Sequence, residues 1–306
     1  MENVTLSEIK RTPELLKQVE SVPFKLEKGK RYLFVGCGSS YNLGYIAAEM
    51  LNKNGYEADV VTGGKIVALG DFPEADVAFF ISRTGESTET VLAAKALKKR
   101  GIYTISIVCA KDAELSKTCE ENIELPFADE ESVVMTGSFS TILYMILRGI
   151  KRYSIDGIEG FLGKSFEYVD RLELKKFSHF VFLGFDELYG LAKESALKVQ
   201  EMALQWVEFH EPLDYRHGPK ATLTEKTLVV MYSKDTAYEV ELAKELKQMG
   251  AGVVYIGKEG DIEIPYQDGF ETPVRILPVQ YLAYKKAVSL GLNPDKPKNL
   301  TKSVKL

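Results

Sequence analysis

The sequence predicts an α/β protein made of two similar lobes, each a doubly wound parallel sheet flanked by helices. The first observation is the order of elements. Short apolar segments typical of strands alternate with longer segments of helical pattern along the 306 residues, and this alternation favours parallel sheets covered on both faces. The second observation is an internal repeat between the two halves of the chain. A chain of this length has room for about two domains, each with its own core.

The repeat consists of residues that recur at a nearly constant distance. Phe34, Gly36, Tyr41 and Leu43 recur 148 residues later as Phe182, Gly184, Tyr189 and Leu191. Ala94-Lys95, Leu97-Lys98 and Gly101 recur 149 residues later as Ala243-Lys244, Leu246-Lys247 and Gly250. Such offsets indicate an internal duplication, although any α/β units share apolar strands and glycines. We predict one domain over residues 1–155, a second over 156–290 and a C-terminal tail over 291–306.

The individual elements follow from apolar runs and from helix-ending residues. We expect a first helix within 6–28, because Pro13 suits a first turn and Gly29 a C-terminal end. Strands and helices are then expected in this order: strand 32–35, helix 41–52, strand 58–62, strand 77–81, helix 88–99, strand 103–108, helix 138–152 and, in the second half, a helix that starts near Leu188.

Composition and local sequence patterns disfavour a nucleic-acid-binding, a membrane-spanning and a secreted protein. The chain has 44 acidic and 39 basic residues and a net charge of −5, which disfavours nucleic acid as a partner because such binding relies on clustered Lys and Arg. No apolar run approaches the roughly 18 to 20 residues of a membrane span, and the N-terminus lacks the pattern of a signal peptide. The cysteines, Cys37, Cys109 and Cys119, show no paired spacing, which suits a reducing cytoplasm. We therefore expect a cytoplasmic protein.

The histidines give no indication of a metal site. His179, His210 and His217 lack the spacing of metal ligands, so we expect no structural zinc. His217 lies between Arg216 and Gly218 in a loop rich in titrating groups. It is therefore a better candidate for proton transfer than His179, which adjoins a strand.

A hydroxyl-rich loop, Ser82-Arg83-Thr84-Gly85-Glu86-Ser87, joins the strand 77–81 to the helix 88–99. In a parallel sheet this loop lies at the carboxyl end of a strand, where the unpaired N–H groups of the next helix attract an anion. Ser82, Thr84, Ser87 and Arg83 therefore fit a phosphate. The alternative is an ordinary N-cap, but a cap needs only one hydroxyl.

A second turn, Gly36-Cys37-Gly38-Ser39-Ser40, follows the strand 32–35. Its GxG pattern invites a dinucleotide interpretation, but Tyr41 replaces the third glycine of that motif. Ser39 and Ser40 fit better as a second phosphate- or sugar-binding turn.

Glu194, Lys198 and Glu201 share one face of the helix that starts near Leu188, because they are four and then three residues apart. A solvated face with ion pairs would explain this spacing. However, the segment 196–206 is otherwise apolar, and a carboxyl group near an apolar wall is suited to act as a general base.

Five stretches in this order together resemble one protein family. They are Gly36-Cys37-Gly38-Ser39-Ser40-Tyr41, Ser82-Arg83-Thr84-Gly85-Glu86-Ser87, Ala196-Leu197-Lys198-Val199-Gln200-Glu201, Arg216-His217-Gly218-Pro219 and Asn299-Leu300-Thr301-Lys302-Ser303-Val304. The chain resembles the sugar isomerase (SIS) domain family, in particular the isomerase half of glucosamine-6-phosphate synthase and its deaminase relatives. The resemblance covers nearly the whole chain.

The resemblance implies two SIS lobes, no cofactor, and a homodimer that shares its active sites. It assigns the sugar phosphate to Ser40, Ser82, Thr84 and Ser87, with Arg83 where the synthase has Gln. It also assigns catalytic roles: Glu201 moves a proton between C1 and C2, Lys198 lies beside it, His217 opens the ring and Lys302 of the tail covers the open sugar. A backbone contact to the sugar is implied for Val133.

The resemblance favours deamination of glucosamine 6-phosphate to fructose 6-phosphate and ammonia. The synthase has a glutaminase domain that supplies ammonia, and we expect none here, since the similarity begins within the first few dozen residues. The segment 132–139 is also similar to that of amino-sugar-phosphate deaminases, with Gly137 where the synthase has Lys. The alternatives are a sugar-phosphate isomerase, a fructosamine-type deglycase and a non-catalytic sugar-phosphate sensor.

Overall fold

The computed structural model describes residues 3–264 and 268–306. It contains two five-stranded parallel sheets flanked by helices, which confirms the predicted fold class. The chain groups into two compact units. We call Lys10–Ser154 with Asn299–Leu306 the first lobe, and the described parts of Met1–Ile9 and Ile155–Lys298 the second lobe.

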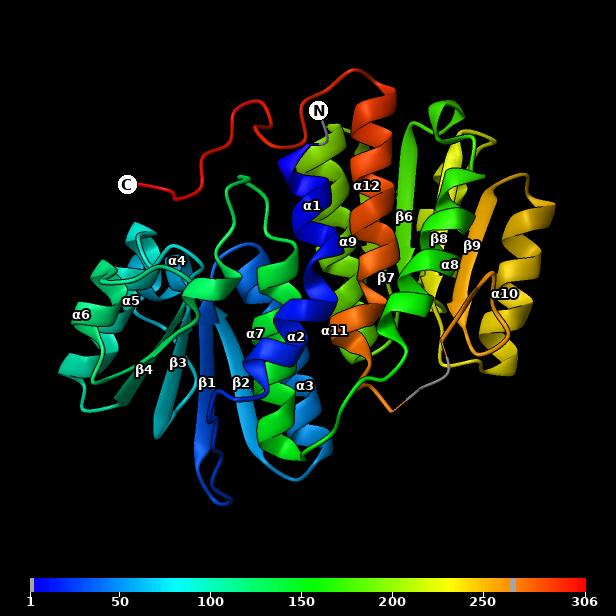
Figure 1. The fold of residues 1–306 in the computed structure, drawn as a ribbon. Helices are drawn as coiled ribbons and strands as arrows, with labels where there is room; N and C mark the ends of the chain where they lie inside the picture. The colour runs from blue at the N-terminus through cyan, green and yellow to red at the C-terminus, as the bar shows by residue number, and fades with distance from the viewer. Residues whose placement is uncertain (1–2, 265–267) are drawn as a thin grey trace. The chain divides into compact units, whose positions relative to one another are not determined.

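The first lobe has its sheet in the order β2-β1-β3-β4-β5 (Figure 1). Its strands are β1 (Arg31–Gly36), β2 (Glu57–Thr62), β3 (Val77–Ile81), β4 (Tyr103–Val108) and β5 (Glu121–Glu124). Its helices are α2 (Thr12–Val19), α3 (Ser39–Lys53), α4 (Gly63–Leu69), α5 (Thr88–Lys99), α6 (Glu114–Thr118) and α7 (Gly137–Ile150), with a 3₁₀ turn at Pro126–Ala128.

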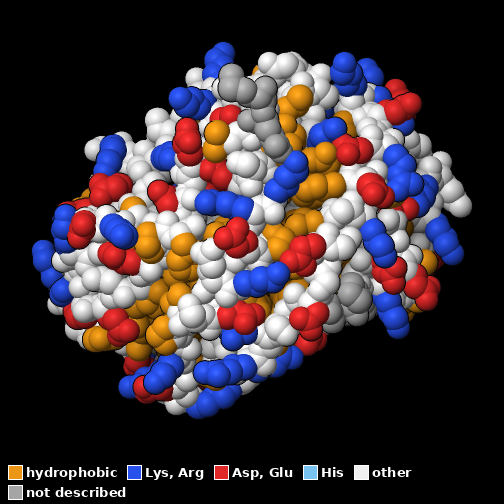
Figure 2. Space-filling model, in the orientation of Figure 1, with side chains coloured by type: hydrophobic (Ala, Val, Ile, Leu, Met, Phe, Trp, Pro, Cys, Tyr) orange, Lys and Arg blue, Asp and Glu red, His pale blue; other side chains and the backbone are white. Residues whose placement is uncertain are grey.

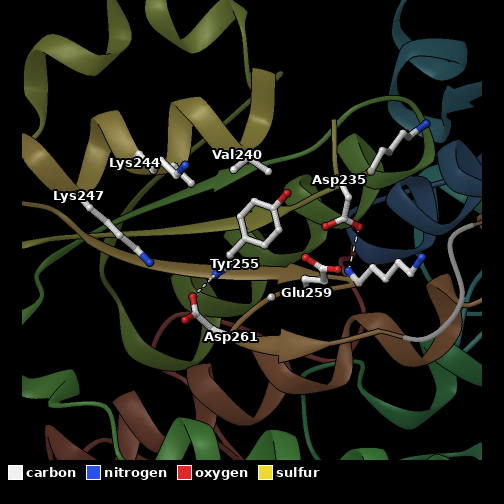
Figure 3. A pocket seen from close by; sticks show the side chains of 11 residues that line it. Asp235, Val240, Lys244, Lys247, Tyr255, Glu259 and Asp261 are labelled. Atoms are coloured by element: carbon white, nitrogen blue, oxygen red, sulfur yellow. Dashed lines mark hydrogen bonds between the residues drawn. The ribbon is translucent and has the colours of Figure 1, made fainter. Parts of the chain in front are cut away.

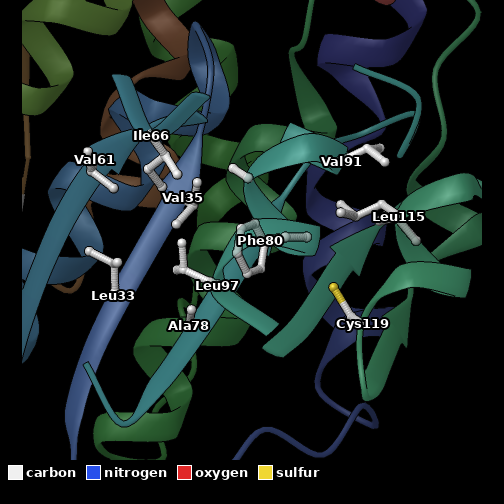
Figure 4. Packing of buried hydrophobic residues seen from close by; sticks show 13 residues of the cluster. Leu33, Val35, Val61, Ile66, Ala78, Phe80, Val91, Leu97, Leu115 and Cys119 are labelled. Carbon is white, nitrogen blue, oxygen red and sulfur yellow. The ribbon is translucent and has the colours of Figure 1, made fainter. Parts of the chain in front are cut away.

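The core of the first lobe follows from the alternation of side chains along its strands. Leu33 and Val35 of β1, with Phe80 of β3, point to the face that α4, α5 and α6 cover, where Leu97 and Leu115 pack against them (Figure 4). The residues between them, including Phe34 and Phe79, point to the other face, and these two rings stack 5.4 Å apart. Because successive strand residues alternate, the apolar runs of the sequence bury both faces of the sheet.

The second lobe has the same arrangement. Its strands are β6 (His179–Leu183), β7 (Trp206–His210), β8 (Thr227–Tyr232), β9 (Gly252–Gly257) and β10 (Ile262–Glu263), in the order β10-β9-β8-β6-β7. Its helices are α1 (Val4–Lys10), α8 (Ile158–Asp170), α9 (Glu187–Ala203), α10 (Ala237–Gln248), α11 (Thr272–Arg275) and α12 (Leu277–Ser289), with 3₁₀ turns at Leu174–Lys176, Asp214–Arg216 and Pro219–Thr222.

The two sheets have one topology, since β2-β1-β3-β4-β5 and β7-β6-β8-β9-β10 correspond strand by strand. Gly36 and Gly184, which the sequence repeat aligned, end β1 and follow β6, and they serve the same purpose. A Cβ at Gly36 would lie 2.7 Å from the backbone of Ser40, and one at Gly184 would lie 2.3 Å from that of Leu188. In both lobes the next helix thus passes too close to the strand end for any other residue.

The N-terminal segment differs from the expectation of one helix within 6–28. The chain forms two helices with a break at Arg11, and the second ends at Val19. Pro13 lies in the first turn of α2, where its missing N–H has no cost. Pro23 disfavours helical backbone at Val22, so the segment after Val19 is irregular.

Candidate active-site residues

The hydroxyl-rich loop lies between β3 and α5, as predicted. Its N-cap residue, Ser87, makes no side-chain hydrogen bond to the first turn of α5, so the simple N-cap interpretation does not hold. Gly85 has φ +66°, and a Cβ there would lie 2.4 Å from that of Ala113. The tight turn brings the Gly85 N–H to Ser82 Oγ at 3.1 Å and the Glu86 N–H to Thr84 Oγ1 at 3.3 Å. The loop is therefore built to hold its hydroxyls at a helix N-terminus.

Ser39 and Ser40 lie in the first turn of α3 and are both buried. Strands β1 and β3 are hydrogen-bonded neighbours and run parallel, so the turn after β1 and the loop after β3 lie at the same edge of the first sheet. Ser40 Oγ lies 3.8 Å from the sulfur of Met135. The structure thus brings together two of the predicted binding stretches.

Arg83 does not present its charge to this loop. Its side chain is 4% exposed, and Nη1 lies 3.2 Å from Glu130 Oε2. Nη2 donates to the carbonyl of Val133 at 2.7 Å, and Nη1 also donates to that of Val134 at 3.1 Å. This placement argues against our expectation that Arg83 binds the phosphate, because its guanidinium is committed to the segment 130–134.

The C-terminal tail lies on the hydroxyl-rich loop within the first lobe. Ser303 Oγ is 2.8 Å from Thr84 Oγ1, and the carbonyl of Val304 accepts the N–H of Thr88 at 3.1 Å. Lys302 Nζ donates to the carbonyl of Glu130 at 2.7 Å. The described chain forms no helix or strand between Leu290 and Leu306.

In the second lobe, α9 carries the predicted Glu194, Lys198 and Glu201 on one face. Lys198 is fully buried, its Nζ lies 2.6 Å from Glu201 Oε2 and 3.3 Å from Glu194 Oε1, and Glu201 keeps 21% of its side chain exposed. Burial by itself would lower the pKa of Lys198, but the two carboxylates outweigh it and raise the pKa. Lys198 therefore remains an ammonium that orients the partly exposed carboxylate of Glu201.

This arrangement is not a solvated helix face with surface ion pairs, because Lys198 and Glu194 have no exposed side-chain area. The sequence prediction placed Glu201 against an apolar wall. In the structure, a buried cation is its immediate neighbour.

The three histidines have different surroundings. His217 is exposed after the 3₁₀ turn, and among the described residues its ring has no hydrogen-bond partner. His179 lies 3.1 Å from Thr227 Oγ1 and 2.9 Å from Glu208 Oε1, and His210 contacts the other oxygen of Glu208. Only His217 thus has a ring available to a ligand. No group of three or more His, Cys, Asp or Glu side chains that could hold a metal occurs in the described residues.

In the second lobe, the corresponding helix terminus is closed by a side-chain cap. This lobe's counterpart to the hydroxyl-rich loop leads into α10, where Thr236 accepts the N–H of Glu239 and the Glu239 carboxylate accepts the N–H of Thr236. Lys234 pairs with Asp186 and Glu187 at the start of α9. The Glu239 carboxylate thus occupies the positive end of α10.

A cavity of about 600 Å³ lies alongside α10 and β9 (Figure 3). Its walls include Lys244, Lys247 and Tyr255, while Asp261 and Asp235 accept backbone N–H groups at 2.8 and 2.9 Å. None of the residues predicted to bind or react lines it. We therefore do not assign the chemistry to this cavity.

Charged side chains of both signs are distributed over the visible face of the molecule (Figure 2). On the face in Figure 2, acidic and basic side chains are interspersed, without a large patch of one sign. Among the described residues, no helix is long and apolar enough to span a membrane.

Sequence reasoning missed Glu130, which is buried. Its carboxylate accepts hydrogen bonds from the Thr136 N–H at 2.9 Å and from Thr136 Oγ1 at 2.7 Å, and it lies at the N-terminus of α7. The available signal was an acidic residue shortly before a helix whose first turn carries the hydroxyls of Thr136 and Ser138.

The fold is that of an α/β protein with two parallel-sheet lobes of one topology. The SIS domain model matches residues 25–148 and 173–274, and the chain belongs to the SIS domain family. It is 36% identical to a glucosamine-6-phosphate deaminase from Thermotoga maritima whose solved structure has a TM-score of 0.92, with 99% of this chain and 100% of that chain covered.

Two further likenesses are more distant. The chain is 26% identical to the glutamine–fructose-6-phosphate aminotransferase of Aquifex aeolicus over 94% of its own length and 54% of that protein's. It thus spans about half the length of the curated relatives it matches. The C-terminal domain of the Francisella tularensis aminotransferase is 20% identical, with a TM-score of 0.80 and coverage of 97% and 99%, and this likeness concerns the fold alone.

Proposed function

We propose that this protein is an amino-sugar-phosphate deaminase that converts glucosamine 6-phosphate to fructose 6-phosphate and ammonia. The observation that carries the proposal is the pair of Lys198 and Glu201, a buried ammonium 2.6 Å from a partly exposed carboxylate. The likeness to the Thermotoga deaminase, which extends over the whole of both chains, supports the deaminating direction.

The phosphate is proposed to bind the hydroxyl-rich loop of the first lobe. Ser82, Thr84 and Ser87 supply hydroxyls, and the N-terminus of α5 supplies N–H groups that no side chain of the loop caps. Ser39 and Ser40 border the same sheet edge. The phosphate is remote from the reacting carbons, so its binding positions the sugar.

Glu201 is proposed as the base. His217 opens the ring by taking the proton of O1 and donating one to the ring oxygen. Glu201 then removes the proton from C2 while the carbonyl oxygen at C1 gains one, which leaves an enolamine. Return of the proton to C1 gives an iminium at C2, and water adds to it and expels ammonia. The carbonyl acidifies the C2–H, so a carboxylate is a sufficient base.

Lys198 and Lys302 are proposed to support this chemistry electrostatically. Lys198 keeps a positive charge beside Glu201, and Lys302 of the tail covers the open sugar near its carbonyl. Val133 is proposed to meet the sugar through its backbone. A homodimer in which His217 serves the neighbouring subunit remains part of the proposal.

The test is ammonia release from a panel of phosphorylated amino sugars, with fructose 6-phosphate measured as the second product. Glucosamine 6-phosphate should give both products in equal amounts. Aldose–ketose interconversion of sugar phosphates without ammonia would instead support an isomerase. Ammonia or an amine released only from fructosamine-type conjugates would support a deglycase, and binding without turnover would support a sensor.

A further inference from the structure

The guanidinium of Arg83 is directed away from the hydroxyl-rich loop, although Arg83 belongs to it. Its Nη1 and Nη2 donate to the carbonyls of Val134 and Val133, and Nη1 also pairs with Glu130. A side chain that is 4% exposed has no freedom to leave these partners for a ligand. The positive charge of Arg83, next to the candidate phosphate site, is therefore paired within the protein with Glu130 and the two carbonyls.

The partner, Glu130, has no side-chain exposure and is surrounded by donors. One oxygen accepts from the N–H and hydroxyl of Thr136 and from the Ser138 N–H at 3.3 Å, and the other accepts from the Ser138 hydroxyl. Burial alone would raise the pKa of Glu130, but the charge of Arg83 and these hydrogen bonds lower it. Glu130 is thus a fixed anion at the positive end of α7.

Arg83 and Glu130 together fix both ends of the segment Val133–Thr136. The guanidinium of Arg83 donates to the carbonyls of Val133 and Val134, and the carboxylate of Glu130 accepts the N–H of Thr136. The planar fork of an Arg reaches several acceptors at once, whereas a Lys offers one charged centre and a Gln only one donor group. The Glu130 carbonyl also accepts Lys302 Nζ, so the same residue is a docking point for the tail.

We propose that Arg83 is a positioning residue, which fixes the segment Val133–Thr136 and the docking point of Lys302 and does not bind the phosphate. The proposal rests on the proposed function in one respect, that the backbone of Val133 meets the sugar. Loss of Arg83 then impairs handling of the sugar and leaves the phosphate site intact.

Inorganic phosphate separates the two roles, because it occupies the phosphate site without touching a sugar subsite. Its dissociation constant is measured by calorimetry for the wild type, Arg83→Gln, Glu130→Gln and Thr84→Ala. Thr84→Ala should weaken phosphate binding by about tenfold, the effect of one charge-assisted hydrogen bond. Arg83→Gln and Glu130→Gln should leave it within about twofold but lower kcat/KM for ammonia release by about tenfold or more.

A second measurement, hydrogen exchange, reports directly on how firmly the segment Val133–Thr136 is held. Hydrogen exchange at the Thr136 and Ser138 amides should accelerate in Arg83→Gln and remain unchanged in Thr84→Ala, since only the former disturbs Glu130. The double variant Arg83→Gln/Glu130→Gln should be no less active than either single variant, because the two residues act through each other. Each single variant leaves the other residue of the ion pair as a buried charge without its partner, whereas the double variant removes both charges. The double variant therefore carries the test if a single variant does not fold.

Phosphate binding weakened as much by Arg83→Gln as by Thr84→Ala would overturn the proposal, as would multiplicative losses in the double variant. A wild type that binds no phosphate would also overturn it, since no phosphate site would then exist beside Arg83. Failure of the proposed function has a different signature. A wild type that binds phosphate but releases no ammonia would refute the deaminase, while the phosphate and exchange measurements would still decide the role of Arg83.

Discussion

Ser303 Oγ of the tail lies 2.8 Å from Thr84 Oγ1 of the hydroxyl-rich loop. Two further backbone groups join the same segments, since Val304 accepts the Thr88 N–H at 3.1 Å and the Leu306 N–H donates to Thr88 Oγ1 at 3.3 Å. The tail therefore occupies donors that a bound phosphate would also use. If the phosphate binds as proposed, we expect its binding and the position of the tail to be coupled through Thr84 and Thr88.

Deleting Lys298–Leu306 should leave a folded protein with little activity. The tail adds no helix or strand, but it carries Lys302, which we expect to cover the open sugar. Circular dichroism and size-exclusion chromatography check folding, and ammonia release checks turnover. Lys302→Ala should reproduce most of the loss, while Lys296→Ala serves as the matched control. Normal turnover by the truncated protein would remove Lys302 from the mechanism.

Replacing Thr84 with Ala should raise KM by about tenfold and change kcat little, because the phosphate is unchanged during the reaction. Thr84→Ser keeps the hydroxyl and should remain close to the wild type. Steady-state kinetics with glucosamine 6-phosphate measure both. An unchanged KM in Thr84→Ala would place the phosphate elsewhere.

Replacing Glu201 with Gln should lower kcat by on the order of 10²- to 10⁴-fold, the usual contribution of general acid–base catalysis. An amide cannot take the C2 proton, but it can still bind the sugar, so affinity measured by calorimetry should stay within a few-fold. Solvent deuterium at C1 of fructose 6-phosphate is the additional readout for the wild type. Glu241→Gln, on an exposed face of α10, makes the same charge change and should be silent.

If Glu201→Gln deaminates at the wild-type rate, Glu201 is not the base. Deuterium alone does not decide this point, because a proton can pass from C2 to C1 without exchange with water. The rate of the variant is therefore the decisive measurement.

Stability at acid pH should depend on Glu130. Its pKa is lowered in the folded protein, below about 4.3 in the unfolded chain. The pair with Arg83 therefore stabilises the fold above the unfolded pKa and loses this contribution as pH falls through the folded pKa. Urea unfolding between pH 3 and 7 should show a shallower pH dependence for Glu130→Gln than for the wild type. If the unfolding free energies of the two proteins changed with pH in parallel, the pKa of Glu130 would be the same in the folded and the unfolded protein.

Local patterns predicted much of the fold. The strands Val77–Ile81 and Tyr103–Val108 and the helix Thr88–Lys99 have the expected bounds, because each is a run of strand-forming or helix-forming residues between turn residues. The first helix was predicted as one segment, since the break at Arg11 depends on how the chain packs and no local pattern marks it.

The candidate site was predicted unevenly for the same reason. The spacing of Lys198 and Glu201 already implies a shared helix face, and their ion pair followed. The partners of Arg83 lie about fifty residues further along the chain, and a pairing between distant segments has no periodicity to reveal it. The charge of Arg83 therefore suggested a phosphate ligand, whereas its surroundings show an internal partner.

The capping box of Thr236 and Glu239 closes the N-terminus of α10, whereas the N-terminus of α5 has no side-chain cap. A helix N-terminus without a side-chain cap gives up about 0.5–2 kcal/mol of stability, and α10 avoids this cost while α5 does not. At α5, the Thr88 N–H donates instead to the carbonyl of Val304 in the tail. The helix terminus proposed to bind the phosphate thus lacks the stability of a side-chain cap, while the proposed base Glu201 lies in the lobe whose α10 is capped.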